Sequence, residues 1–208
     1  MRRIGIVVGI LTATLLGAQT VHATLLTDSN AMGGPWQGVK TFAYTGNLLK
    51  VDVQYAVYAP GQFALSFPGL DPTGGADFIY AYQVFNTDYA DSTYVNRLSI
   101  GLSGGNEQAS DIAYVPVGGV TPNDIGANPP CGFDPGTAGW NFKNPVIVYG
   151  QTSDVLFFAS PFAPEWDSAT AGGQYRKSMT LPSPTPEPAT LSLLLAGFLL
   201  AGRRARKL

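Results

Sequence analysis

Histidine, cysteine and charged residues are all scarce in this chain. Its 208 residues include one His and one Cys, and only 12% are charged, against roughly 25% in an ordinary soluble chain. The single histidine, His22, falls within an N-terminal segment that we expect to be removed. Without a histidine, the remaining chain is excluded from Ser-His-Asp and Cys-His catalysis and from histidine-based zinc, copper and iron sites.

Positive charge is scarce as well once the two ends are set aside. Residues 24–186 carry six Lys or Arg and thirteen Asp or Glu, so six minus thirteen gives a net charge of −7, whereas the whole chain has −2. This acidic balance excludes a protein that binds nucleic acid by neutralising phosphates. The lone Cys131 has no partner for an internal disulfide, which leaves a buried or incidental residue, a free thiol or an intermolecular bond.

The N-terminus has the pattern of a secretory signal peptide. Arg2 and Arg3 precede an apolar run over residues 4–17, and small residues stand at Val21 and Ala23. A positive start, a short apolar stretch and an A-x-A-like site are typical of segments removed during export. We therefore expect export by the Sec machinery, cleavage after Ala23 and a mature chain that begins at Thr24.

The C-terminus combines a proline-rich spacer, an apolar segment and a basic tail. Residues 181–185 predict a semi-rigid polyproline spacer, and Pro186, Glu187 and Pro188 follow it. The uncharged residues 189–202 would form a helix of about 21 Å, short of the roughly 30 Å hydrocarbon core. We expect a marginal, transient membrane span. Its basic end, which should stay cytoplasmic, consists of Arg203, Arg204, Arg206 and Lys207.

This three-part ending, residues 186–208, resembles the PEP-CTERM sorting signal of bacterial exported proteins. The resemblance implies processing near Pro186 by an exosortase-type membrane protease, an inner-membrane intermediate, and release to the envelope or the extracellular matrix. Members of that family tend to occur in bacteria that make exopolysaccharide. A GPI-anchor signal would end in a hydrophobic tail, whereas this chain ends basic. A permanent single-span anchor remains the alternative.

The intervening residues 24–180 predict one all-β domain, an antiparallel β-sandwich of Ig-like or jelly-roll type. Residues 49–57 alternate apolar and polar side chains, and residues 78–85 are apolar on both faces, which indicates a central strand. Gly/Pro-rich turns separate many short strands, as in a sandwich, and residues 118–143 predict a long surface loop. The other expected strands are 39–44, 63–67, 95–102, 112–117, 146–149, 155–160 and 175–180.

Three tryptophans and one acidic loop are the candidate binding residues. Trp36, Trp140 and Trp166 lie in Gly/Pro-rich stretches, where the rings would either stack on sugars or close the ends of the core. Asn86, Asp88 and Asp91 offer closely spaced oxygen ligands of the kind that Ca²⁺ prefers, or they supply hairpin-turn geometry. Calcium is the one cofactor that this pattern admits.

Two further patterns bear on catalysis. Gly101-Leu102-Ser103-Gly104-Gly105 fits a nucleophile elbow, but that motif needs a histidine base, so it predicts a turn. Glu165 and Asp167 could place two carboxylates at glycosidase spacing, or they form an acidic loop. The sequence thus predicts a non-enzymatic exported domain with a structural or adhesive role. The alternatives are an exopolysaccharide-binding module, Ca²⁺-dependent or not, and a carboxylate glycosidase.

Overall fold

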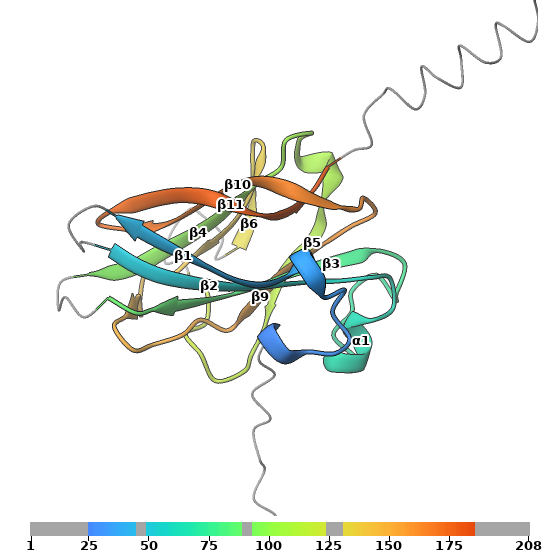
Figure 1. Cartoon of the computed structure of the whole chain (residues 1–208), viewed down its shortest axis with the longest axis horizontal. Coiled ribbons are helices and arrows are strands. Elements are labelled where there is room, and N and C mark those ends of the chain that lie inside the picture. The colour runs from blue at the N-terminus through green and yellow to red at the C-terminus, as the bar shows by residue number, and fades with distance from the viewer. Residues whose placement is uncertain (1–24, 45–48, 89–92, 124–130, 186–208) are drawn as a thin grey trace, which may run out of the picture.

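The computed structural model contains two antiparallel β-sheets packed face to face (Figure 1), which confirms the predicted all-β sandwich. It describes residues 25–44, 49–88, 93–123 and 131–185. The expected signal peptide with Ala23, the Pro186-Glu187-Pro188 motif, the apolar segment and the basic tail lie outside these residues. Within the described ranges, no helix is long and apolar enough to cross a membrane.

The first sheet has five strands, and its central strand is the one that the sequence places there. The strand order is β1-β2-β3-β9-β5, with every neighbouring pair antiparallel. In the third strand, Tyr80 and Tyr82 point into the space between the sheets, while Ile79 and Ala81 point to the opposite side. The strands are β1 (Gln37–Tyr44), β2 (Leu49–Tyr58), β3 (Phe78–Asn86), β9 (Val155–Ser160) and β5 (Ser110–Val115).

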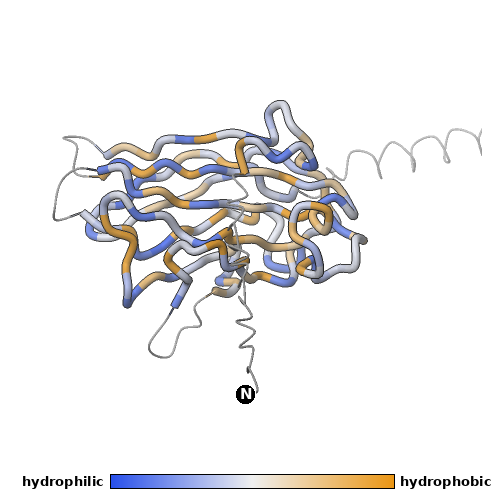
Figure 2. The backbone as a smooth tube through the Cα atoms, turned by 90° about the horizontal axis from the view of Figure 1, so that it is seen from below, coloured by the Kyte–Doolittle hydropathy of each residue, from blue (hydrophilic) through white to orange (hydrophobic). Residues whose placement is uncertain are grey.

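The second sheet runs in the order β11-β10-β4-β7-β6, and the short strand β8 also pairs with β4. Figure 2 shows that the hydropathy changes repeatedly along the backbone, between hydrophilic and hydrophobic residues. This is expected for strands that bury one side. The strands are β11 (Arg176–Pro184), β10 (Pro164–Gly173), β4 (Tyr94–Gly101), β7 (Thr137–Asn141), β6 (Cys131–Asp134) and β8 (Ile147–Val148).

The main core lies between the two sheets and is rich in aromatic rings. Trp140 of β7 is fully buried and stacks on Phe158 of β9 with 6.3 Å between ring centroids. Phe158 also stacks on Tyr80 at 5.1 Å. Because a large buried ring removes much apolar surface from water, this inter-sheet stack contributes strongly to holding the sheets together.

A second apolar cluster covers part of the outer face of the first sheet. The segment 63–67, expected to be a strand, contains the helix α1 (Phe63–Ser66), which lies away from β10 and β11 (Figure 1). The prediction was wrong because Phe63 and Phe67 are also spaced for one helical turn. Their rings lie 4.7 Å apart, and Phe67 N donates to Phe63 O at 2.9 Å. The short 3-10 turns are η1 (Leu25–Thr27), η2 (Gly34–Trp36) and η3 (Asn106–Gln108).

Two segments expected to lack strands contain them. The predicted loop 118–143 holds the β6–β7 hairpin, whose glycine-containing strands lack a simple apolar alternation. The expected spacer begins too early, because β11 continues to Pro184 with Leu181 fully buried. Proline is tolerated there because β11 is an edge strand, where a backbone N–H is not needed on the open side.

Candidate functional site

An aromatic cluster, formed by Trp36, Tyr55 and Trp166, lies where the N-terminal segment meets β10. The centroids of Trp36 and Trp166 are 5.8 Å apart with 30° between their planes, which is a stacked arrangement. Tyr55 of β2 meets Trp166 edge-on, also at 5.8 Å and with 81° between the planes. Offset-stacked and edge-to-face pairs are the favoured aromatic geometries. The cluster thus holds Trp166 in place although 40% of its surface is exposed.

Two smaller features fix this cluster. Lys40 Nζ of β1 lies 4.9 Å from the centroid of Trp166, within cation–π range. Gly38 of the same strand leaves room for Tyr55, since a Cβ at Gly38 would lie 2.8 Å from the Tyr55 hydroxyl oxygen. No local sequence pattern marks Lys40 or Tyr55 as part of a site, because their contacts with Trp166 depend on how β1 and β2 pack against β10.

Trp140 does not belong to this surface, and of its two predicted roles, sugar stacking and packing in the core, the structure shows the packing role. Its ring is fully buried in the inter-sheet core, and its Nε1 donates to Ala113 O at 2.9 Å. A ring without exposed surface cannot stack on a polymer. Of the three tryptophans, the structure therefore brings together Trp36, which is half-buried, and Trp166, which is exposed.

Glu165 and Asp167 lie on the strand β10 and not on a loop. Glu165 is exposed, whereas Asp167 is half-buried and accepts backbone hydrogen bonds. Its Oδ2 accepts from Ser103 N at 2.9 Å, and its Oδ1 accepts from Ser168 N at 2.6 Å. Asp167 thus ties the turn after β4 to β10, so both its carboxylate oxygens have structural partners. The proposed glycosidase pair remains a prediction.

The suggested calcium ligands lie where β3 ends. Asn86 is buried, and its Nδ2 donates to Thr93 O at 3.2 Å and to Ile147 O at 3.1 Å. Its Oδ1 accepts from Asp88 N at 3.1 Å, so the Asn86 amide pins neighbouring backbone. Asp88 is buried and Asp91 lies outside the described residues. Among the residues that the structure describes, no group of three His, Cys, Asp or Glu side chains is placed to hold a metal.

Cys131 begins β6 and is half-buried against the main core. Its Sγ contacts Ile112 O at 3.6 Å, and burial raises the pKa of the thiol above its usual value. A raised pKa lowers the thiolate fraction at neutral pH, and the thiolate is the nucleophilic form. This environment is typical of a packing cysteine.

No family model, curated protein or solved structure matches this chain.

Proposed function

We propose that this chain is an exported, non-catalytic β-sandwich with a structural or adhesive role in the cell envelope or extracellular matrix. The observation that carries the proposal is the aromatic cluster of Trp36, Tyr55 and Trp166. Its most exposed ring is held rigidly on the sandwich by two aromatic neighbours and Lys40. Rigid aromatic side chains with exposed surface supply contact area at a low cost in conformational entropy, and they are enriched at binding interfaces.

The sorting of the chain belongs to the same proposal. The signal-peptide pattern before Thr24 and the PEP-CTERM-like ending support export, a transient membrane intermediate and processing near Pro186. Intact-mass measurement of the protein released from the producing cells tests this. A chain that begins at Thr24 and ends close to Pro186 is expected, whereas retention of residues 189–208 would favour a permanent anchor.

A carbohydrate-binding module is the second candidate, and the exposed face of Trp166 favours it. Aromatic rings bind sugars by stacking on their apolar faces. The partner would be the exopolysaccharide of the producing organism. Because the Asn86 amide, including its Oδ1, already bonds to backbone groups, we expect binding that is insensitive to EDTA.

Binding of residues 24–186 to that exopolysaccharide, with and without EDTA, separates the two candidates. Trp166→Ala is the test variant, and Tyr149→Ala is the matched control because Tyr149 is 48% exposed and lies outside the cluster. Saturable binding that Trp166→Ala lowers about tenfold, and Tyr149→Ala does not, would identify a carbohydrate-binding module. Absence of binding would leave the structural or adhesive role, and the partner would then be sought among envelope proteins.

A further inference from the structure

The outer face of the second sheet consists of small and polar residues. Ala171, Leu98 and Trp140 form one cross-strand row that is buried in the core. Since successive side chains of a strand point to opposite faces, the adjacent rows point away from the core. One outward row is Arg176, Gly172, Arg97 and Asn141; the next is Ser178, Thr170, Ser99, Gly139 and Gly132; a third contains Gly101, Thr137 and Asp134.

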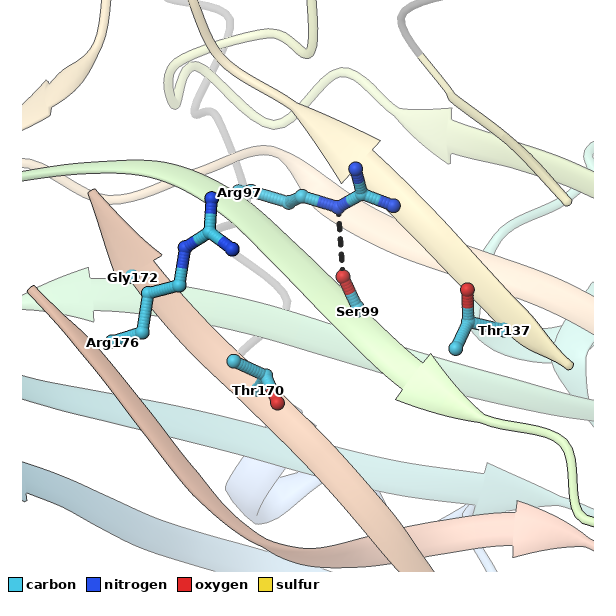
Figure 3. A pocket seen from close by; sticks show the side chains of 6 residues that line it. All are labelled: Arg97, Ser99, Thr137, Thr170, Gly172 and Arg176. Atoms are coloured by element: carbon cyan, nitrogen blue, oxygen red, sulfur yellow. Dashed lines mark hydrogen bonds between the residues drawn. The ribbon is translucent and has the colours of Figure 1, made fainter. Parts of the chain in front are cut away.

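A hollow of about 270 Å³ opens on this face. Roughly 300 Å³ is the lower end for pockets that take a drug-sized ligand, so this hollow suits one sugar ring or one charged group. Two arginines and three hydroxyl groups surround it, as Figure 3 shows. Its lining is Arg97, Ser99, Thr137, Thr170, Gly172 and Arg176.

Arg97 is held in a fixed position over the sheet. Its Nε donates to Ser99 Oγ at 2.8 Å, and its Nη2 forms an ion pair with Asp134 (Figure 3 draws the bond to Ser99). The guanidinium lies over Gly139, where a Cβ would come 3.2 Å from Nη2. Because a guanidinium carries five N–H donors, these two bonds leave further donors to face the hollow.

Arg176 differs from Arg97 because it has no hydrogen bond or ion pair to any residue in the described ranges. It stands on the edge strand β11, directly across from Gly172 of β10. The missing side chain at Gly172 lets Arg176 lie close over β10, since a Cβ at Gly172 would come 2.7 Å from Arg176 Cγ. Asp134 is the one carboxylate in the three outward rows, and it is already paired with Arg97, so a net positive charge remains.

We propose that this hollow, the basic hollow, binds the acid group of an acidic saccharide. A guanidinium matches a carboxylate or sulfate through two parallel N–H···O bonds. The hydroxyls of Ser99, Thr137 and Thr170 can both donate and accept, as sugar hydroxyls require. The absent side chains of Gly139 and Gly172 let Arg97 and Arg176 lie close against the sheet, which places both guanidinium groups at the hollow. The positive charge is local, because residues 24–186 together carry −7.

The inference depends on the proposed function in one respect, namely that the exported chain meets extracellular polysaccharide. It concerns a surface separate from the aromatic cluster, so the two can fail independently. Loss of binding in Trp166→Ala reports on the aromatic cluster. Loss of binding in Arg176→Gln reports on the basic hollow.

Equilibrium binding of the full chain, purified in a non-ionic detergent, to polygalacturonate at low salt tests the site. The uncharged comparison is the fully methyl-esterified polymer, and dextran sulfate against dextran shows whether a sulfate serves as well as a carboxylate. Lys177→Gln is the matched control. It removes the same charge from the next residue of β11, whose side chain lies on the opposite face, paired with Ala171. Arg176→Lys keeps the charge but loses the fork geometry.

We expect polygalacturonate to bind, its methyl ester not to bind, and Arg176→Gln to weaken binding roughly tenfold. Lys177→Gln should change the affinity less than twofold, and Arg176→Lys should fall between. Binding of dextran sulfate with the same dependence on Arg176 would widen the acid group to sulfate. Any of three results would overturn the proposal. They are equal binding of the ester, equal losses of affinity in Arg176→Gln and Lys177→Gln, and no binding to either acidic polymer. Unchanged thermal unfolding of the variants shows that folding is intact.

Discussion

The outer faces of the two sheets differ in what lies over them. On the first sheet, Ala81 of β3 and Phe157 of β9 are buried beneath α1 and the N-terminal turn η1, within the second apolar cluster. On the second sheet, the corresponding face is open and carries glycines, hydroxyls and two arginines. The first face therefore contributes to stability, whereas the second face is available for contact.

The strand sequences explain this difference. Strands β3 and β9 are apolar on both faces, so leaving one face in water would expose a continuous apolar surface. Strand β10 has small buried residues, Ala169 and Ala171, that alternate with polar or glycine positions. Such a strand buries one face and needs no cover on the other. The same fold thus combines a covered sheet with an open one.

Removing the cover should have the largest effect. Phe63 of α1 is fully buried against Tyr58, Phe67 and Phe157, so Phe63→Ala should lower the free energy of unfolding by about 3–5 kcal/mol. Leu65→Ala, in the same helix but 62% exposed, should change it by no more than about 0.5 kcal/mol. Urea unfolding measures both. Equal effects would show that α1 is not part of the fold's stable core.

Alkaline pH should destabilise the fold through buried tyrosines of the first sheet. Burial, and then the neighbouring Asp28 carboxylate, raise the pKa of Tyr58 far above its ordinary value, and burial does the same for Tyr80 and Tyr82. A tyrosine whose pKa is raised by folding makes its full contribution to the free energy of unfolding below about pH 10. Above that pH, the free energy of unfolding falls by about 1.4 kcal/mol per pH unit for each such tyrosine, because the tyrosine ionises first in the unfolded chain.

The variant Tyr58→Phe isolates one of these groups. At neutral pH it should cost about 1–2 kcal/mol, because the hydroxyl no longer donates to Asp28 at 2.7 Å. Above about pH 10 the variant lacks one ionising group, so its deficit should shrink by about 1.4 kcal/mol per pH unit and vanish near pH 11. Urea unfolding over this range measures the crossing. A constant deficit would mean that Tyr58 ionises in the folded chain.

Placing a valine on each outer face compares the two faces directly. Ala81→Val on the covered face should cost about 1–3 kcal/mol by overpacking. Gly139→Val on the open face should change stability by about 0.5 kcal/mol or less, since its nearest neighbour is the flexible end of Arg97. It should, however, reduce polygalacturonate binding by displacing the Arg97 guanidinium, which lies over Gly139. Thermal unfolding and binding of both variants give the comparison, and an equal loss of stability would contradict it.

The sequence predicted the sandwich because apolar alternation is a local signal, and it predicted the central place of β3 because that segment is apolar on both faces. It did not predict β10, whose buried residues are alanines, nor the β6–β7 hairpin, whose strands contain glycine. The helix α1 was ambiguous because Phe63 and Phe67 fit two periods. Nor did the sequence predict which residues from distant segments lie together in the candidate sites. Trp36 meets Trp166, and Arg97 lies across Gly172 from Arg176, only through strand order and register, which no local pattern determines.

The smallest stability effect should come from the Arg97–Asp134 ion pair, and it is the most informative about the open face. Arg97 and Asp134 are 39% and 62% exposed, so Asp134→Asn should change the free energy of unfolding by less than about 0.5 kcal/mol. If the ion pair has no part in ligand binding, Asp134→Asn should leave the affinity for polygalacturonate unchanged. If the basic hollow recognises an acid group, removing the competing carboxylate frees Arg97 and should tighten polygalacturonate binding about two- to fivefold at low salt. Asp111→Asn removes the same charge from β5 of the other sheet. An increase in Asp134→Asn alone therefore assigns the effect to the hollow and not to the net charge of the domain.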